Sequence, residues 1–320
     1  MQPLLRRAAK RARTRALTAA TRTIHSNVRL EPPSFATTFP THLPNDFQPL
    51  TMVASWICAT DHKILRFRLP SHCTNLSALG VPSGVKVRQR VAGELMDKSY
   101  SPISHATANG SVDLLVKSYP GGGLGKYLYD MKCGDTVDIK FKPEKLFQGQ
   151  KYVANRWKKL LLIGNGTGIA PLYQLAQHIV QDPMDVTHIA MVSQHRSELL
   201  MQTELDAMVV DGKEKNSFQH LSILSQPPPS LSKDVYVSGR LELAHLTAMN
   251  LTGGGVQPTT EEERSGKHVI VCGTDDFLQT VCGPHVRIDV EGQIKKKKQQ
   301  GPLLGLLKEA GFVKNNVSKL

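Results

Sequence analysis

The stretch Leu160-Leu161-Leu162-Ile163-Gly164-Asn165-Gly166-Thr167-Gly168-Ile169-Ala170-Pro171 decides the fold that this 320-residue sequence predicts. Its first four residues are a short continuous apolar run, which is typical of a buried strand. The glycines let the backbone turn tightly and let a phosphate approach the N–H groups, and a helix beginning near Pro171 would direct its positive end at that anion. Ile169 occupies the last glycine position of the common dinucleotide fingerprint, so a tight turn without a ligand is the alternative.

Strands and helices alternate after this stretch. The sequence predicts a helix over 171–180, a strand over 189–192, a helix over 198–210, and further strands over 218–224 and 269–272. Alternation of this kind indicates parallel βαβ units. We therefore expect an α/β parallel-sheet domain over residues 151–320, with a boundary near 145–158 and surface loops at 227–233 and 253–265.

The preceding region has a different pattern. Short β-rich runs at 50–57, 64–69, 85–91, 112–119 and 136–141 are separated by turn residues, and one short helix is expected over 124–131. Such spacing predicts an antiparallel barrel or sandwich over residues 47–150. The chain is thus predicted to have two domains, an N-terminal β-barrel and a C-terminal α/β domain.

Both ends of the chain carry targeting signals. Residues 1–30 are rich in Arg, Ala and Thr and contain no acid, which is typical of a mitochondrial transit peptide, and residues 31–46 have the composition of a linker. The last three residues, Ser318-Lys319-Leu320, spell a peroxisomal address. We expect a mitochondrial protein, with the peroxisome or glycosome as the alternative.

Charge and cysteine usage exclude several functions. The net charge of +13 includes eight Lys and Arg in residues 1–30 and four lysines in residues 295–298, so the remaining chain carries only +1. That leaves no distributed basic groove for nucleic acid. The lysine run fits a solvated loop better than a docking site for an acidic partner. The five cysteines form no C-x-x-C pair, no H-E-x-x-H occurs, and no apolar run approaches the ~18 residues of a membrane span. We expect no metal site and no transmembrane segment.

Three further motifs carry chemistry. In residues 98–104 a cation, an aromatic ring and hydroxyl groups share one extended segment, which could hold the phosphate and the ring of a flavin, and alternation would put Lys98, Tyr100 and Pro102 on one face. Residues 120–128 place a glycine run before a helix, which again suits a phosphate. Residues 269–275 end a strand in Cys272-Gly273, where α/β sheets bind ligands. An edge strand, a flexible loop and a packed cysteine are the respective alternatives.

These motifs occur in the order seen in ferredoxin-reductase-like flavoproteins, and residues 47–320 most closely resemble the NADH–cytochrome b5 reductase family. The segments Phe47-x-Pro49-Leu50, 113–119, 131–136 and 301–312 carry the rest of the resemblance. It implies FAD and NAD(P)H as cofactors. The sequence departs from the family pattern in having Lys98 in place of Arg, Gly125 in place of Ser and Thr274 in place of Pro.

The resemblance also implies roles for matching positions. Ser101 would steady the reduced flavin, and Cys272 would shape the nicotinamide pocket without acting as a nucleophile. FAD would be held by Lys98, Tyr100, Ser101, Ser104, Val116, Lys117, Tyr119, Gly122, Gly123, Leu124 and Gly125, with Thr167 touching the flavin side. The nicotinamide nucleotide would be held by Gly164, Gly166, Gly168, Pro171, Cys272 and Gly273.

The predicted function is electron transfer from NAD(P)H through FAD to a one-electron acceptor, most naturally a cytochrome b5-like haem protein. A reductase with a quinone or iron–sulfur acceptor and a degenerate, non-enzymatic complex subunit are the alternatives. The choice between NADH and NADPH stays open: no acid follows residues 218–224, whereas His195-Arg196 follows residues 189–192 and could meet a 2′-phosphate.

Overall fold

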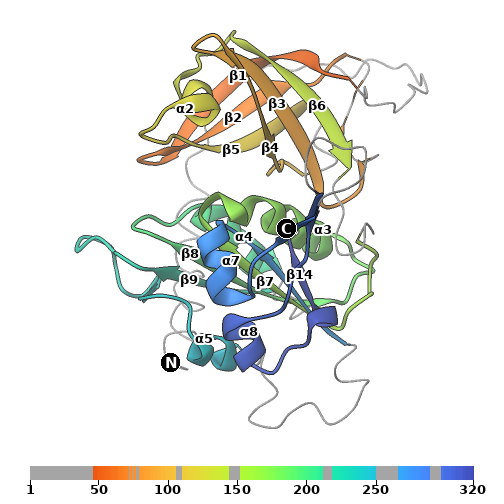
Figure 1. The fold of residues 1–320 in the computed structure, drawn as a ribbon, viewed down its shortest axis with the longest axis vertical. Helices are drawn as coiled ribbons and strands as arrows, with labels where there is room; N and C mark the ends of the chain where they lie inside the picture. The colour runs from red at the N-terminus through yellow and green to blue at the C-terminus, as the bar shows by residue number, and fades with distance from the viewer. Residues whose placement is uncertain are drawn as a thin grey trace.

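The computed structural model describes residues 46–71, 73, 75–76, 79–105, 110–143, 152–211, 218–249, 266–288 and 297–320. Within them the chain forms an antiparallel β-domain followed by a parallel α/β domain (Figure 1). The predicted transit peptide, nearly all of the linker, the predicted loop 253–265, Lys295 and Lys296 lie outside the described residues.

The N-terminal domain is a six-stranded antiparallel sheet that closes on itself. Its strand order is β4-β3-β6-β1-β2-β5. Beyond the end of β4, Pro102 forms a β-bridge to Leu114 in β5, and the Ile103 N–H donates to the Asp113 carbonyl at 2.9 Å. This bridge joins the two edge strands, as the predicted barrel requires. The strands are β1 (Gln48–Ala59), β2 (His62–Arg68), β3 (Ser83–Val91), β4 (Glu94–Tyr100), β5 (Ser111–Lys117) and β6 (Thr136–Pro143).

Alternating residues of these strands fill the barrel. Leu65 and Phe67 of β2 and Val85 and Val87 of β3 are each buried inside it. The helix α2 (Gly123–Asp130) packs against β3, β4 and β5, with Leu124 and Leu128 fully buried. The glycine run that precedes α2 is therefore fixed beside β4 and β5.

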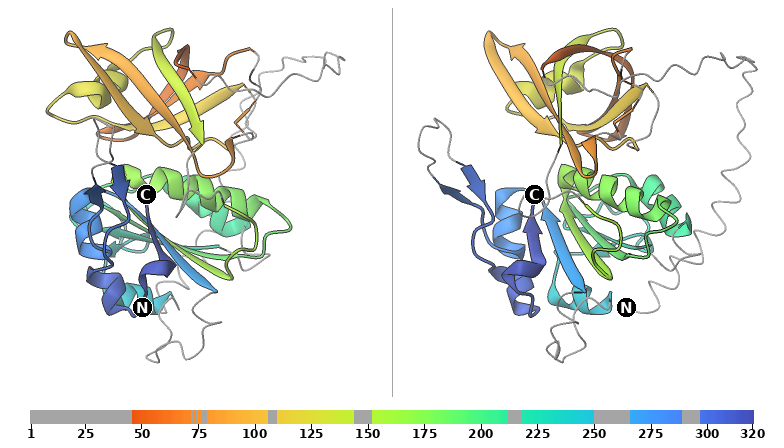
Figure 2. Two further views of the ribbon diagram at one scale, coloured as in Figure 1. Left: turned by 45° about the vertical axis from the view of Figure 1, so that its right-hand side comes forward. Right: turned by 90° about the vertical axis from the view of Figure 1, so that its right-hand side faces the viewer.

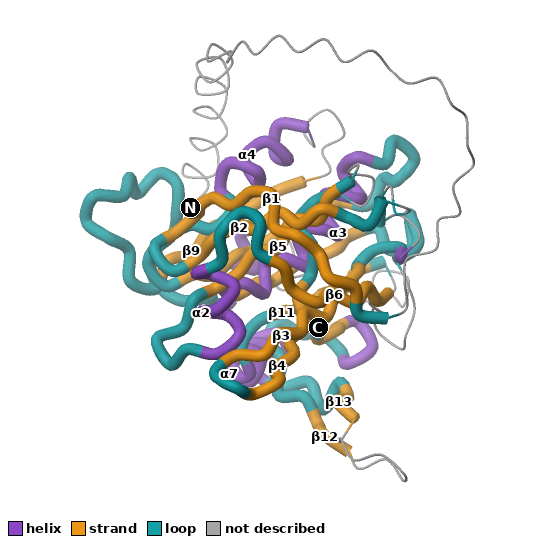
Figure 3. Tube along the Cα trace, turned by 90° about the horizontal axis from the view of Figure 1, so that it is seen from above, coloured by secondary structure: helices purple, strands orange, loops and turns teal. Residues whose placement is uncertain are grey.

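The C-terminal domain is a six-stranded parallel sheet in the order β10-β9-β8-β7-β11-β14. Helices lie on both faces of it (Figure 2). The elements are β7 (Lys159–Asn165), the 3-10 turn η3 (Gly166–Gly168), α3 (Ile169–Gln181), β8 (His188–His195), α4 (Gln202–Asp211), β9 (Phe218–Leu224), β10 (Val237–Ser238), α5 (Leu243–Ala248), β11 (Lys267–Cys272), α7 (Asp275–Val281), α8 (Gly305–Glu309), the 3-10 turn η4 (Lys314–Asn316) and β14 (Val317–Lys319). A short hairpin of β12 (Val286–Ile288) and β13 (Lys297–Gln299) projects from the domain (Figure 3).

Burial on both faces explains the continuous apolar run of β7. Leu160 and Leu162 pack in the cluster that contains α3, while Leu161 and Ile163 pack in the cluster that contains α7. A strand covered on both sides needs apolar residues at every position. The sequence prediction of a parallel α/β domain is confirmed.

Two predicted helix boundaries shift in the structure. The helix expected at Pro171 begins at Ile169, directly after a 3-10 turn of the glycine loop. The helix expected at Glu198 begins at Gln202. Glu198 lies outside it because its carboxylate accepts hydrogen bonds from the backbone N–H and the hydroxyl of Thr60, in the turn between β1 and β2.

The tripeptide Ser318-Lys319-Leu320 takes part in the last strand of the sheet, which sequence analysis did not predict. β14 pairs with β11, and the Leu320 N–H donates to the Val271 carbonyl at 2.9 Å. Ser318 is fully buried and bonds His268 at 2.8 Å. The buried Lys319 ammonium donates to the carbonyls of Pro284 and Pro302. The signal-like sequence is therefore part of the folded core.

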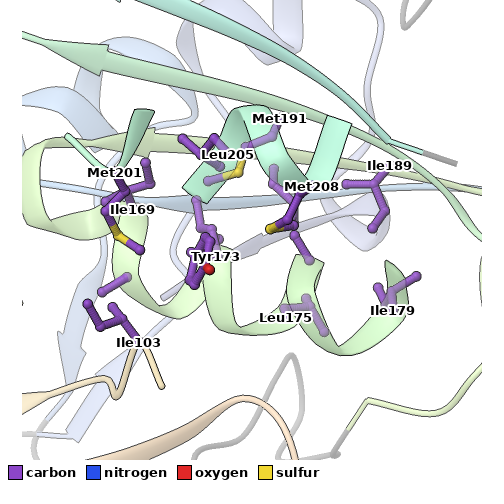
Figure 4. Packing of buried hydrophobic residues seen from close by; sticks show 14 of the residues in the cluster. Ile103, Ile169, Tyr173, Leu175, Ile179, Ile189, Met191, Met201, Leu205 and Met208 are labelled. Atoms are coloured by element: carbon purple, nitrogen blue, oxygen red, sulfur yellow. The ribbon is translucent and has the colours of Figure 1, made fainter. Parts of the chain in front are cut away.

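One apolar cluster is shared by the two domains. Ile103 of the barrel packs in the same cluster as Ile169 and Tyr173 of α3 (Figure 4). Because a continuous buried apolar surface resists sliding, this cluster fixes α3 against the barrel.

A buried polar pair adds direction to that contact. The Gln174 side chain of α3 accepts a hydrogen bond from the Ser83 backbone N–H at 2.6 Å and donates to the Ser83 hydroxyl at 2.8 Å. Gln174 is 2% exposed and Ser83 is fully buried. Separation of the domains would break both of these hydrogen bonds between Gln174 and Ser83.

We predict that Gln174→Ala destabilises the protein by about 2–3 kcal/mol, because it strands two buried polar groups and leaves a cavity. Urea unfolding measures this loss. Gln177→Ala, one turn further along the same helix and less buried, is the matched control and should cost clearly less. Equal losses for the two variants would contradict the assigned role of Gln174.

Candidate active site

Two helices begin at glycine-rich turns with no side-chain cap. The N-cap of α2 is Gly122 and that of α3 is Gly168; neither helix has a side-chain cap bond or an acidic residue in its first turn. The first N–H groups of a helix need partners outside the helix, and its dipole favours an anion there. Each helix comes from a different domain, so the chain offers two separate positions for a phosphate group.

A cationic aromatic group lies next to the first of these helices. The Lys98 and Lys117 ammonium groups each lie 5.6 Å from the centre of the Tyr119 ring, which is 46% exposed. Lys98 and Tyr100 pair with Val87 and Val85 across the β3–β4 ladder, so they lie on one face as predicted. Burial, with Tyr119 nearby, raises the pKa of Tyr100 to about 12. The group therefore combines two lysine ammonium groups with two tyrosine rings.

Other predicted FAD residues have structural partners. The Ser104 hydroxyl accepts a hydrogen bond from the Asp113 N–H at 3.1 Å and so helps to close the barrel. Val116 and Leu124 are fully buried in the barrel core. Neither residue presents its side chain to a cofactor, because both side chains pack inside the barrel. Ser101 is half-buried, directly after β4.

Gly125 is fixed by a close approach between α2 and β5. A Cβ atom at this position would lie 2.6 Å from the Lys117 carbonyl oxygen and 3.4 Å from the Tyr119 ring. The Lys117 carbonyl cannot move away without disturbing β5. In this chain the serine of the family pattern would not fit, because the Lys117 carbonyl and the Tyr119 ring fill the space that its side chain would take.

The glycine loop of β7 packs against the end of β11. A Cβ atom at Gly168 would lie 2.5 Å from the Cys272 carbonyl oxygen and 2.9 Å from the Gly273 nitrogen. β7 and β11 are neighbours, with Gly164 opposite Cys272. The structure therefore brings together the glycine loop and the Cys272-Gly273 motif, which are about 100 residues apart in the sequence. Thr274 caps α7 by accepting from the Phe277 N–H, which gives the departure from proline a structural role.

The barrel and the glycine loop meet at one place. β5, which carries Lys117, lies against the 3-10 turn η3 of the glycine loop. The flavin-type residues of one domain and the nucleotide-type residues of the other thus border a common region. A ring held by the barrel would therefore be near a ring held at the carboxyl edge of the sheet.

Sequence reasoning missed Asp61 and His62 at this junction, and it did not place Lys117 and His195 beside them. Lys117 pairs with Asp61 at 3.2 Å, and Asp61 lies 2.5 Å from the His62 ring. His195, at the end of β8, is 4% exposed, and neither of its ring nitrogens has a hydrogen-bond partner among the described residues. Burial, and secondarily the nearby His62 and Lys117, lower the pKa of His195 to about 4. Only the packing of the two domains reveals this group, because its members are distant in the sequence.

The residues present fit the two cofactors that the motifs imply. A Cβ atom at Gly121, Gly122 or Gly166 would meet nothing within 4 Å, so space is open over both uncapped helix ends. Lys98 and Lys117 supply positive charge beside the first end. An anionic diphosphate suits each position.

The described residues contain neither a metal-ligand cluster nor a membrane-spanning helix. Among those residues no group of three His, Cys, Asp or Glu side chains is placed to hold a metal ion. No helix in the described part of the chain combines the length and the apolar character needed to cross a bilayer.

The pKa of His195 predicts a pH dependence of stability. A histidine with a pKa of about 4 when folded and about 6.5 when unfolded binds more protons in the unfolded state between those pH values. The free energy of unfolding should therefore fall as pH drops from 6.5 to 4, with about 2–3 kcal/mol of the loss due to His195. His195→Gln should flatten this part of the profile, and the exposed His188→Gln should not. Identical profiles for His195→Gln and the wild type, measured by urea unfolding, would disprove this.

The contact at Gly125 yields a stability test. We expect Gly125→Ala to cost about 2–3 kcal/mol, because the added methyl group overlaps the backbone of β5. Gly121→Ala is the matched control: its Cβ atom meets nothing within 4 Å, and its cost should stay below about 1 kcal/mol. Thermal unfolding of both variants checks the difference, and a tolerated Gly125→Ala would show that α2 can move away from β5.

Comparisons with known proteins agree with this geometry. Residues 49–144 match the family model of the oxidoreductase FAD-binding domain, and residues 162–283 match that of the oxidoreductase NAD-binding domain. The chain is 31% identical to NADH-cytochrome b5 reductase 2 of Neurospora crassa over 80% of this chain and 68% of that protein. It is 30% identical to NADH-cytochrome b5 reductase 2 of Scheffersomyces stipitis, over 84% of this chain and 82% of that protein.

A solved structure shows the same fold. The cytochrome b5 reductase domain of Ulva prolifera nitrate reductase superposes with a TM-score of 0.60 at 20% identity, covering 75% of this chain and 91% of that domain. With the two domain matches and the identity to curated relatives, the chain belongs to the cytochrome b5 reductase family of FAD- and NAD-binding oxidoreductases.

Proposed function

We propose that this oxidoreductase passes electrons from NAD(P)H, through FAD, to a cytochrome b5-like haem protein. The observation that carries the proposal is the contact of β5 with the glycine turn η3, which brings the two cofactor regions together. The similar proteins named above are NADH-cytochrome b5 reductases, and this supports a cytochrome b5-like haem protein as the electron acceptor. When bound, the flavin supplies a hydride acceptor that can release single electrons.

The barrel residues would bind and orient the flavin. Lys98 and Lys117 offer positive charge for its diphosphate, together with the N–H groups at the start of α2, and Tyr100 offers a neutral ring face. Lysine is a weaker phosphate ligand than arginine because it lacks the bidentate fork. Lys98 keeps the positive charge of the arginine in the family pattern, and Lys117 lies at the same distance of 5.6 Å from the Tyr119 ring.

The sheet residues would bind and orient the nicotinamide nucleotide. The N–H groups at η3 and α3 suit its diphosphate, while Thr167 and Cys272 lie on the two loops that meet at Gly168. Cys272 is half-buried and packs against the apolar cluster shared by the domains. That setting supports its proposed role in shaping the nicotinamide pocket, and Ser101 is proposed as the hydroxyl nearest the reacting part of the flavin.

A mitochondrial location is proposed on the basis of residues 1–30. The burial of Ser318 and Lys319 in β14 supports this location over the peroxisomal alternative, because a receptor would have to break the strand to bind the tripeptide.

The proposal predicts a yellow protein whose flavin absorption is bleached by NADH or NADPH without oxygen. Adding oxidised cytochrome b5 should restore the band and produce the spectrum of reduced haem. Steady-state rates should be higher with cytochrome b5 than with a quinone or an iron–sulfur protein. A colourless protein after FAD addition would support the non-enzymatic alternative, and faster quinone reduction would replace the haem acceptor.

A further inference from the structure

The turns after β8 and β9 are joined into one polar rim. Arg196 follows β8 and Gln226 follows β9 by two residues, and the Arg196 Nε–H donates to the Gln226 side-chain oxygen at 2.8 Å. The backbones are also bonded: the Gln226 N–H donates to the Arg196 carbonyl at 2.7 Å, and the Ser225 N–H donates to the His195 carbonyl at 3.0 Å. The guanidinium is thus oriented by a neutral partner while remaining exposed.

This rim lies where a dinucleotide presents its adenosine ribose. The diphosphate position is the glycine loop after β7, and β8 is the neighbouring strand on one side of it. In α/β dinucleotide sites an acid at the end of that neighbouring strand bonds the ribose 2′-hydroxyl of NAD, whereas an arginine there accommodates the 2′-phosphate of NADP. In this chain β8 ends at His195, and Arg196 follows it directly.

The acids near the rim are engaged in other contacts. Both oxygens of Glu198 accept from the Thr60 N–H, at 3.1 and 3.0 Å, and one also accepts from the Thr60 hydroxyl at 2.9 Å. Glu242 forms the capping box at the start of α5 with His245. In the described residues 194–198, 224–226 and 239–242 no other acid is present. Both carboxylates in these ranges are bound elsewhere in the fold, so neither is placed to select the 2′-hydroxyl.

His195 and Arg196 have separate roles in the structure, although the sequence pairs them. The His195 ring is buried near His62 and Lys117 of the barrel, and those surroundings keep it neutral. Arg196 is the exposed member. The positive charge of the rim therefore comes from Arg196, with the Ser225 hydroxyl and the Gln226 amide beside it.

We infer that Arg196, Ser225 and Gln226 form a binding site for the 2′-phosphate of NADPH, so that this chain favours NADPH although its relatives are named as NADH reductases. The inference rests on the proposed function for the place of the nucleotide. It assigns the preference for NADPH over NADH to the Arg196 guanidinium, which the Gln226 side chain holds in place. Such a group can bind a phosphate with two parallel hydrogen bonds, and a carboxylate at this position would oppose it.

The test compares two analogues that cannot transfer a hydride. Binding of 2′,5′-ADP and 5′-AMP to the full-length protein, saturated with FAD, is measured by calorimetry at low salt. We expect 2′,5′-ADP to bind at least about tenfold more tightly, as a charge-assisted bond to phosphate predicts. Equal affinities, or no binding of either analogue, would overturn the inference.

Three variants localise the effect. Arg196→Gln should reduce the preference for 2′,5′-ADP to about twofold or less while leaving 5′-AMP binding unchanged. Arg196→Lys should keep part of it, since the charge remains and the fork is lost. Arg68→Gln, which removes an exposed arginine of the barrel, is the matched control and should keep the full preference. A wild-type preference that survives Arg196→Gln would refute the assigned site.

These results distinguish failure of the 2′-phosphate site from failure of the proposed function. Because the analogues report nucleotide binding alone, a preference for 2′,5′-ADP that depends on Arg196 supports the 2′-phosphate site even if no haem protein is reduced. Flavin reduction by NADPH and NADH with equal efficiency, together with equal analogue binding, would leave the reductase function intact and overturn the site.

Discussion

The buried contact between α3 and the barrel is the constraint on which the rest of the structure depends. The same helix carries the glycine turn at its beginning and Gln174 in its middle, and Gln174 is bonded twice to Ser83 of β3. A helix is stiff over this length, so fixing its middle also fixes its beginning. The uncapped N–H groups of α3 are thereby held at a set place relative to β5. Apolar packing alone is not directional, whereas these two hydrogen bonds have a defined geometry.

The acids near the junction of the two domains have structural partners, two of which are cations. Asp113 forms two bonds of 2.7 Å with the Arg66 guanidinium. Asp61 is paired with Lys117, and Glu198 is bound by Thr60 in the β1–β2 turn. Lys98 faces the Tyr119 ring instead of a carboxylate. Two uncapped helix ends, with Lys98 beside the first of them, favour anionic ligands at this junction. Two dinucleotides, each with a diphosphate, match this distribution of charge.

Departures from the family pattern have local physical causes in this chain. Gly125 allows α2 to lie against the Lys117 carbonyl, and Thr274 gives α7 a side-chain cap. In both places a residue associated with ligand binding in the family is replaced by one that serves packing or capping. The proposed phosphate position at α2 therefore depends on backbone N–H groups, with Lys98 and Lys117 nearby. A change in composition at the site does not require a change in fold, because the helix ends still supply the donors.

The sequence by itself determined the two-domain architecture, the parallel sheet around residues 160–163 and the two glycine-opened helices, because these depend on apolar periodicity and turn residues. It also placed Lys98 and Tyr100 on one face, since strand alternation is a local property. The start of α4, the strand made from Ser318 and Lys319, and the junction of His195 with the barrel were decided only by tertiary structure. Glu198 leaves its helix for Thr60, and Ser318 is buried by pairing with β11. Such partners lie 50 to 138 residues away along the chain, and no local pattern encodes a contact of that range.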